Sequence, residues 1–599
     1  MASSTSIPTF LLLMIFVLLP AARRANAASV FAGLSFESEG EAETFEDALL
    51  RQACFSVSSG HEACVSRLDT ARGGAGSGPV PVLRAALRDT LGEAVGAAGA
   101  VRALASLSNH AREEMAVRDC VELLGYSVDE LGWALDAMAE SGGEDLELGA
   151  SSGGRGVAAA ARRAEEDLHA WLSAALGNQD TCVEGFRGTD GHLARRVEAA
   201  VAQLTQLVSN LLAMHKRLRS ITPLLHHAPP GRNNGTSGGA DDLSSELPPW
   251  VMDVEEDGGD MDDDEEPKPK RGRAAGGGVK PTRVDVVVAQ DGSGRYRTVS
   301  EAVARAPSHS KRKYVIYVKR GVYHENVEVR KKKTNIVLVG EGMGETVISG
   351  SRSFSGGWTT FRSATFAVAG AGFVARDLTI RNTAGPAAHQ AVALRVDSDR
   401  SAFFRVAVEG YQDTLYAHSL RQFYRDCRVS GTVDFVFGNG IAVLQRTLVS
   451  TRPPLAPGQA ASVTAQGRKD PNQNTGFVFH GCVVEAAHPT FLGRPWKPFS
   501  RVVVMESYLG PGVQARGWME WAATGAAGEH SVALATLFYG EYGNYGPGAG
   551  VAGRVKWPGY HVIMDATVAG RFTVRRFIDG LAWLPGTGVT FTADLFRKK

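Results

Sequence analysis

Four polar side chains recur at a nearly constant interval in the C-terminal half of the chain. Gln390 lies 22 positions before Gln412, and Asp413 lies 21 positions before Asp434. If one coil of a β-solenoid spans that interval, these residues lie at equivalent places on successive coils, about 4.7–4.9 Å apart. Two carboxyl groups that close resist joint ionisation, so one keeps a proton while the other can attack. With amide groups beside them to stabilise an oxyanion, the cluster suits hydrolysis; the alternative is a set of solvated turn residues.

The sequence pattern around this cluster is typical of β-structure. From about Val284 onward, short β-rich runs are separated by Gly, Asn, Asp and Pro turns, and several recur about 20 residues apart. Helix signals are few, and residues 299–306 give the clearest one. Many short strands without intervening helices indicate a sandwich, a barrel or a β-solenoid.

The N-terminal part has a different organisation. Residues 40–225 are rich in Ala, Leu, Glu and Arg, and apolar residues between Val197 and Leu212 follow the i, i+3, i+4, i+7 spacing of a helix. This pattern predicts an antiparallel helix bundle. Residues 226–280 contain an acidic block, a basic block and a Gly run, which predict a disordered linker. The basic stretch at residues 268–273 is a candidate protease site.

The first residues resemble a secretory signal. Phe10–Leu19 is an apolar run too short to span a bilayer, and Ala25–Ala27 has the small-residue pattern of a cleavage site, so residues 1–27 are predicted to be a signal peptide. No later segment contains 18 consecutive apolar residues, so no membrane association is expected. The sequon at Asn234 predicts glycosylation of a secreted protein.

Charge is distributed unevenly along the chain. The 599 residues include 64 Lys and Arg and 64 Asp and Glu, but from Lys280 to the end there are 40 basic and 23 acidic residues. A basic C-terminal half favours a polyanionic partner such as a nucleic acid, an anionic membrane or an acidic polysaccharide. Plain solubility is the alternative explanation.

Five segments of the C-terminal half occur in an order that resembles the signature of the pectin methylesterase family. They are Gly321–Glu325, Gln390–Leu394, Gln412–Leu415, Asp434–Gly438 and Leu492–Trp496. The resemblance covers residues 284–599. It implies a right-handed parallel β-helix with a long surface cleft, acting on pectin (homogalacturonan) in the extracellular cell wall. It implies no cofactor, no metal ion and no nucleic acid.

The resemblance also implies roles for individual residues. Asp434 matches the nucleophile, and Asp413 matches the general acid that later serves as base. Gln390 and Gln412 match the amides that stabilise the oxyanion, and Arg494 matches the residue that holds the nucleophile. The residues expected to contact substrate, besides Gln390 and Arg494, are Thr360, Phe361, Tyr416, Trp496 and Trp518.

The helical region resembles the pectin methylesterase inhibitor and invertase inhibitor family. The resemblance implies a four-helix bundle with disulfides Cys54–Cys64 and Cys120–Cys182. It also implies an intramolecular inhibitor, or a folding and retention segment, that a processing protease removes; separate inhibitor proteins are further candidate partners.

Two cysteines remain in the catalytic half. Relatives pair the position of Cys427 with a cysteine where this chain has Thr447. Cys427 is therefore expected to be free or, as the alternative, joined to Cys482.

Two other functions remain open from the sequence. A β-helix with two carboxylates could instead cleave glycosidic bonds as a polygalacturonase or a pectate lyase. Alternatively, the protein could act mainly as an inhibitor through its bundle. The amide pair and Arg494 favour the esterase, and the intact motifs argue against a purely inhibitory role.

Overall fold

The computed structural model describes residues 45–54, 65–66, 68, 79–140, 154–225, 283–453, 459–521 and 533–596. The chain divides into two units, residues 1–48 and 49–599, and only the start of helix α1 is described in the first. The predicted signal peptide, the linker at residues 226–280, Cys64 and Asn234 lie outside the described residues. No described helix is long and apolar enough to cross a membrane.

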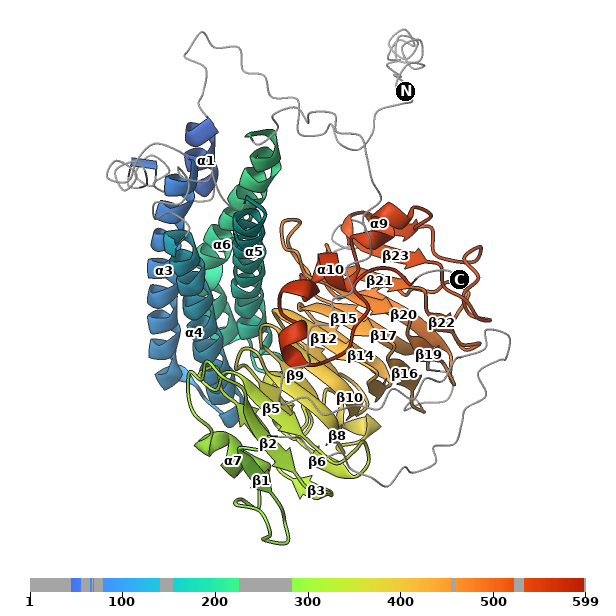
Figure 1. Cartoon of the computed structure of the whole chain (residues 1–599). Coiled ribbons are helices and arrows are strands. Elements are labelled where there is room, and N and C mark those ends of the chain that lie inside the picture. The colour runs from blue at the N-terminus through green and yellow to red at the C-terminus, as the bar shows by residue number, and fades with distance from the viewer. Residues whose placement is uncertain are drawn as a thin grey trace, which may run out of the picture. The chain divides into compact units, whose positions relative to one another are not determined.

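Long helices make up the N-terminal part, drawn in blue and green in Figure 1. They are α1 (Phe45–Cys54), α3 (Pro79–Ala103), α4 (Ala111–Glu140), α5 (Gly154–Glu184) and α6 (His192–Leu225), with a short 3₁₀ turn at Leu104–Leu107. The predicted apolar stripe of α6 is buried, from Val197 at 0 % exposure to Leu212 at 0 %. A disulfide joins Cys120 of α4 to Cys182 of α5, as expected. Cys54 is also disulfide-bonded.

Strands dominate from residue 286 onward. They are β1 (Val286–Val288), β2 (Tyr314–Val318), β3 (Gly321–His324), β4 (Val327–Val329), β5 (Ile336–Val339), β6 (Thr346–Gly350), β7 (Phe366–Val368), β8 (Val374–Asn382), β9 (Leu394–Val396), β10 (Ser401–Glu409), β11 (Leu415–Ala417), β12 (Arg421–Arg425), β13 (Arg428–Gly431), β14 (Val433–Gly438), β15 (Ile441–Gln445), β16 (Leu448–Thr451), β17 (Ala461–Gln466), β18 (Gly476–His480), β19 (Val483–Glu485), β20 (Thr490–Pro495), β21 (Arg501–Met505), β22 (Tyr508–Leu509), β23 (Phe538–Tyr542) and β24 (Tyr560–Val562).

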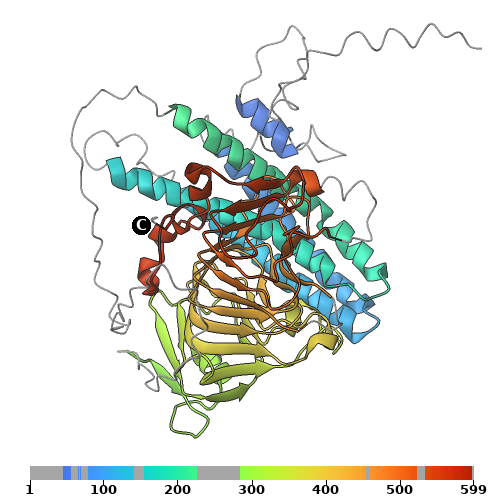
Figure 2. The same ribbon diagram turned by 90° about the vertical axis from the view of Figure 1, so that its right-hand side faces the viewer.

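These strands form a right-handed parallel β-helix, which confirms the predicted fold. Each strand pairs in parallel with its counterpart on the next coil, and Figure 2 shows the coils stacked on one another. One sheet has the order β20-β17-β14-β11-β9-β7-β4. Within it Leu394 pairs with Leu415 and Leu415 with Val436, so one coil spans 21 residues at this point. The interval read from the sequence is therefore the length of a coil.

The interior of the β-helix is a continuous apolar core. Phe366, Phe373, Phe403 and Phe477 lie in it with 0 % exposure. A second cluster covers the outer face of the large sheet, where Phe423 and Val443 pack against the C-terminal helices α9 (Ala566–Gly570) and α10 (Val574–Phe577) and the segment that follows. Inward and outward faces of the strands are thus both buried, as in other parallel sheets.

A column of left-handed residues forms one corner of the β-helix. The positions are Asp377 (φ 58°), Arg405 (φ 50°), Asp426 (φ 51°), Arg446 (φ 50°), Gly481 (φ 60°), Glu506 (φ 50°) and Gly543 (φ 59°). The strand registers place them on successive coils. Opposite charges alternate over part of this column, and Arg405 Nε lies 2.6 Å from Asp377 Oδ1. The chain therefore turns at the same place on each coil.

Cys427 and Cys482 are both free and buried. The register Arg428–Leu448–Val483 places Thr447 on the coil between them. Two ladder spacings of about 4.8 Å exceed the span of a disulfide, so the alternative Cys427–Cys482 bond is excluded by geometry.

The short helix α7 (Val299–Arg305) is held at its N-terminus by two acceptors. Thr298 accepts a hydrogen bond from the Glu301 amide, and the Glu325 carboxylate accepts from the amides of Val299 (2.8 Å) and Ser300 (2.9 Å). Negative groups are favoured at this end of a helix. The segment Gly321–Glu325 therefore supports the first coils by holding helix α7.

Candidate active site

Asp413 and Asp434 lie on neighbouring coils at equivalent positions. Asp413 precedes β11 by two residues, and the register offset of 21 between β11 and β14 places Asp434 opposite it. Both have left-handed backbone, with φ 61° and 51°. Asp434 lies where the pairing of β14 with β17 is interrupted by a bulge between Val433 and Val436. Bulges of this kind redirect a side chain out of the ordinary strand alternation.

Arg494 on β20 holds the Asp434 carboxylate with two hydrogen bonds. Arg494 Nε donates to Asp434 Oδ1 at 2.9 Å, and Nη2 donates to Oδ2 at 2.6 Å. The guanidinium also lies 4.3 Å from the centroid of the Trp521 ring. This fork geometry fixes the orientation of the carboxylate and keeps it paired with a positive charge. Arg494 is therefore placed as the family resemblance implied.

Asp413 is buried and, by contrast, has no cation bound in this way among the described residues. Burial, followed by the negative charge of Asp434, holds the pKa of Asp413 well above the ordinary value of 3.8. The more distant Arg494 and Arg187 oppose this shift without reversing it. The pair thus consists of one carboxylate held by a cation and one carboxyl group whose protonated form is favoured.

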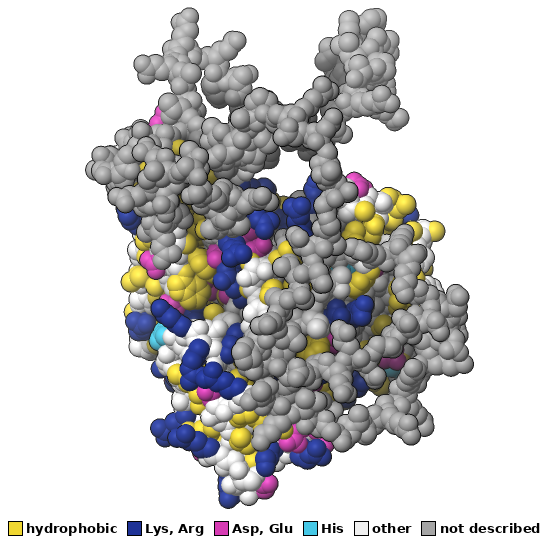
Figure 3. All heavy atoms as spheres, in the orientation of Figure 1, with side chains coloured by type: hydrophobic (Ala, Val, Ile, Leu, Met, Phe, Trp, Pro, Cys, Tyr) yellow, Lys and Arg dark blue, Asp and Glu magenta, His cyan; other side chains and the backbone are white. Residues whose placement is uncertain are grey.

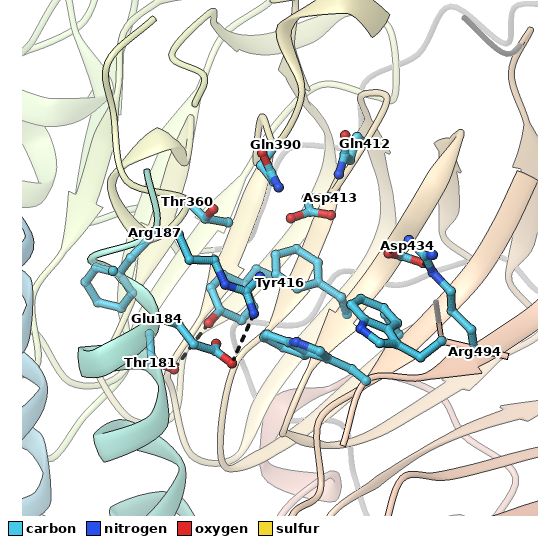
Figure 4. A pocket seen from close by; sticks show the side chains of 16 residues that line it. Thr181, Glu184, Arg187, Thr360, Gln390, Gln412, Asp413, Tyr416, Asp434 and Arg494 are labelled. Carbon is cyan, nitrogen blue, oxygen red and sulfur yellow. Dashed lines mark hydrogen bonds and ion pairs between the residues drawn. The ribbon is translucent and has the colours of Figure 1, made fainter. Parts of the chain in front are cut away.

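Gln390 and Gln412 extend toward Asp413 in Figure 4. The Ala391 amide donates to the Gln412 carbonyl at 3.2 Å, just as the Asp413 amide donates to the Val433 carbonyl one coil further on. Because Asp413 lies opposite Asp434 in the second case, Ala391 lies opposite Asp413 and Gln390 opposite Gln412, as the spacing predicted. Both amides line the same pocket as the two carboxyl groups.

Aromatic side chains form one wall of this pocket. Tyr416 stacks on Phe437 of the next coil with ring centroids 4.1 Å apart, and Phe437 lies 6.1 Å from Trp496. The pocket is lined by Thr360, Phe361, Gln390, Gln412, Asp413, Tyr416, Asp434, Phe437, Ala465, Arg494, Trp496 and Trp521 of the β-helix. Phe437 and Trp521 were not predicted.

Trp518 is not among these lining residues, and the prediction that it lines the cleft was wrong. Its exposure is 0 %, its indole N–H donates to Glu541 at 3.2 Å, and its ring packs against Tyr539 at 4.3 Å. It belongs to the interior core. Trp521, three residues later, contacts Arg494 instead.

The same pocket is bounded on its other side by the end of helix α5. Figure 4 shows Thr181, Glu184 and Arg187 facing the catalytic residues, and Gly185 completes this wall. Thr181 Oγ1 lies 2.8 Å from His418 Nε2 and 3.3 Å from the Tyr416 hydroxyl. Glu184 lies 2.8 Å from Lys497 Nζ. The remaining cavity is about 180 Å³, smaller than the roughly 300–1,000 Å³ of most small-molecule sites.

A parallel β-helix that carries a cation-held aspartate beside a second, buried carboxyl group has the groups that a hydrolase needs. Comparison with known proteins gives the family. The profile of the Pectinesterase family matches residues 285–581, and that of the plant invertase/pectin methylesterase inhibitor family matches residues 48–214.

Relatives match over most of the chain. The pectinesterase/pectinesterase inhibitor PPE8B of Prunus persica is 45 % identical over 85 % of this chain and 88 % of its own length. Pectinesterase 2 of Arabidopsis thaliana is 42 % identical over 81 % of this chain and 79 % of its own. The solved pectin methylesterase from carrot is 51 % identical, covers 52 % of this chain and 98 % of its own, and superposes with a TM-score of 0.50. The chain belongs to the pectinesterase family and is a pectin-demethylating enzyme with an inhibitor-type N-terminal domain.

Proposed function

We propose that Asp434 is the nucleophile of this pectinesterase. Its carboxylate oxygen attacks the C6 carbonyl carbon of a methyl-esterified galacturonate, and a tetrahedral intermediate forms. The observation that carries this assignment is the two-bond contact from Arg494, which pairs the carboxylate with a positive charge and fixes its orientation. The amides of Gln390 and Gln412 are placed to donate to the oxyanion.

Asp413 supplies the proton in the first step. Because its pKa is raised by burial and by Asp434, it can hold a proton that it gives to the departing methoxy oxygen. Methanol leaves, and the sugar remains on Asp434 as an acyl anhydride. The Asp413 carboxylate then takes a proton from water, whose oxygen attacks the anhydride and releases galacturonate and free Asp434.

Replacement of Asp434 by Asn tests this mechanism. The substitution keeps the shape of the side chain and removes the attacking charge. Methanol release from pectin, measured after the bundle has been released, should therefore fall to background, while a cooperative thermal transition shows that the variant still folds. Methanol release at a rate close to the wild-type rate would refute the assignment. Reducing-end and unsaturated-product assays on the same samples distinguish an esterase from a glycosidase or a lyase.

The N-terminal domain is proposed to act as an intramolecular inhibitor. Thr181, Glu184 and Arg187 bound the catalytic pocket and leave a space too small for a polymer. We therefore expect the full chain to be latent and to gain activity when a protease cuts the linker at residues 226–280. We further propose that residues 1–27 direct secretion, that Asn234 carries a glycan, and that separate inhibitor proteins of the same family bind the processed enzyme at this face.

A specific protease site introduced into the linker tests latency. Methanol release should rise after cleavage and subsequent separation of the fragments, while the same protease should leave the unmodified chain unchanged. Equal rates before and after separation would show that the bundle does not block the pocket.

A further inference from the structure

The contact between the helical bundle and the β-helix is built from charges of opposite sign. Carboxylates of α4 and α5 face cations of the β-helix almost throughout. The pairs are Asp119–Arg362, Glu122–Arg362, Asp129–Lys331, Glu130–Lys331, Asp167–Arg400, Asp167–Arg421, Asp180–Lys469 and Glu184–Lys497. One ion pair has the reverse sense, between Arg162 and Asp579 at 3.4 Å. The bundle thus presents a row of carboxylates to a row of cations.

One of these cations, Arg362, lies next to a residue of the catalytic pocket, and Lys331 shares a hollow with it. Arg362 follows Phe361, which lines that pocket, and its guanidinium lies 5.4 Å from the centroid of the Phe361 ring. Lys331 and Arg362 line a separate open hollow of about 850 Å³ between the first coils and α4. The hollow is also lined by the cations Arg330 and Lys332 and by His309. In Figure 3, many of the side chains visible over the first coils are Lys or Arg.

Two of the four carboxylates that meet these two cations are deeply buried. The side chains of Asp119 and Glu130 are 1 % and 2 % exposed. Asp119 Oδ1 lies 2.5 Å from Arg362 Nε, and Glu130 Oε1 lies 3.3 Å from Lys331 Nζ. Lys331 is further held between the rings of Tyr126 and Trp133, each 4.6 Å away. Each of the two cations therefore binds a buried carboxylate at close range.

The β-helix itself offers these cations little negative charge. Of the carboxylates described in the β-helix, Glu328 is the one ion-paired with Arg362, at 3.9 Å, and none is ion-paired with Lys331. When the bundle is released, Lys331 and Arg362 lose their four carboxylate partners. Both then face an open hollow beside the catalytic pocket, where a polyanion can replace the bundle.

We propose that Lys331 and Arg362 form a binding site for the free carboxylates of de-esterified galacturonan, and that the carboxylates of α4 occupy this site in the full chain. The inference rests on the proposed function, because the product of that reaction is a polymer that gains one carboxylate for each ester cleaved. The bundle and the product then compete for the same cations. A stretch of pectin that is already demethylated is held beside the pocket while the next esters react.

Oligogalacturonate binding to the full chain tests the proposal. The probe is an unesterified oligomer of about ten residues, and titration calorimetry measures its affinity. Wild-type chain should bind it weakly because α4 occupies the cations. The variant Asp119→Asn/Glu130→Gln should bind it at least about tenfold more tightly, since one 1.4 kcal/mol interaction is worth a factor of ten. The affinity for a neutral galacto-oligosaccharide of the same length should be the same for the variant and the wild type.

A second pair of substitutions decides where the oligomer binds. Adding Lys331→Met and Arg362→Met to the variant should return the affinity to the wild-type value. Adding Arg571→Met, which removes an exposed cation outside the hollow, should leave the gain intact. A gain that survives loss of Lys331 and Arg362 would place the oligomer in the catalytic pocket and overturn the proposal.

Because Asp119 and Glu130 are buried, their replacement could prevent folding. The variant Glu122→Gln/Asp129→Asn removes the two more exposed carboxylates, 23 % and 51 % exposed, and should tighten binding about threefold with the same dependence on Lys331 and Arg362. If neither variant binds the oligomer more tightly than the wild type, the proposal is overturned. Methanol release is measured separately, so a failure of the esterase assignment remains distinguishable from a failure of this binding site.

Discussion

Replacing Arg494 by Met should show how much the activity depends on the orientation of the proposed nucleophile, Asp434, which the substitution leaves in place. The substitution keeps most of the side-chain volume and removes both hydrogen bonds to Asp434, at 2.9 and 2.6 Å. Removing one partner of a buried ion pair costs about 3–5 kcal/mol. The Asp434 side chain is 6 % exposed, but that of Arg494 is 20 % exposed, so water can replace part of the contact and we expect the lower end, about 3 kcal/mol. If that loss falls on the transition state, kcat/KM drops by about 100-fold.

The chain offers a matched control for this substitution. Arg575 makes the same fork with Asp594, at 2.8 and 2.7 Å, but on the surface, where the side chains are 40 % and 59 % exposed. Exposed pairs contribute about 0–1 kcal/mol, so Arg575→Met should leave kcat/KM unchanged.

Methanol release from pectin should be measured for both variants after the bundle has been released, together with thermal unfolding. The reasoning would be refuted if the kcat/KM of Arg494→Met were within about threefold of the wild-type value, or if both variants lost activity equally. A tenfold change in kcat/KM corresponds to about 1.4 kcal/mol.

Three further predictions follow from particular contacts. Asp413→Asn should lower methanol release by about 10²–10⁴-fold, as expected for a general acid and base. The same substitution should raise the thermal midpoint, and the gain should grow as the pH rises above the ordinary Asp pKa of 3.8. Burial raises the pKa of Asp413 in the folded wild type, which therefore loses stability over this range while the variant does not; a gain independent of pH would contradict this. Thr447→Cys should form a disulfide with Cys427 or Cys482 and add about 3 kcal/mol to the free energy of unfolding; labelling of the denatured chain should find one free thiol, and three would contradict it. Trp521→Ala should lower kcat/KM about fivefold through loss of about 1 kcal/mol of contact with Arg494, and unchanged kinetics would exclude Trp521 from the site.

The position of the two aspartates could be predicted because a solenoid converts sequence interval into distance. Once a coil spans 21 residues, Asp413 and Asp434 must be neighbours, and the parallel register shows that they are. The same holds for the amides, because the hydrogen bond from the Ala391 amide to the Gln412 carbonyl aligns Gln390 with Gln412 on the next coil. A spacing argument is thus accurate for residues that lie on stacked coils.

The aromatic residues were harder to assign for a different reason. Trp518 and Trp521 lie three positions apart in an irregular segment, where no alternation of inward and outward side chains can be read from the sequence. Trp518 is buried in the core and Trp521 faces Arg494. Contacts between residues that are hundreds of positions apart also cannot be predicted from the local sequence pattern. Thr181 belongs to a helix whose apolar spacing predicts only bundle packing, yet its hydroxyl contacts His418.

Asp413 and Asp434 share a backbone conformation that restricts which acid can serve at each position. With φ at 61° and 51°, both residues are in the left-handed region, which Asp and Asn tolerate better than longer side chains because a short polar group can satisfy the local backbone. Glu carries the same charge but not the same tolerance, and a left-handed residue of ordinary type costs about 1–2 kcal/mol. Replacing either Asp by Glu would therefore lower the stability of the fold and also move the carboxylate oxygen away from its position in the pocket. The main chain at these two positions therefore favours the shorter acid, by a margin small enough that Glu506 (φ 50°) adopts the same conformation elsewhere in the β-helix.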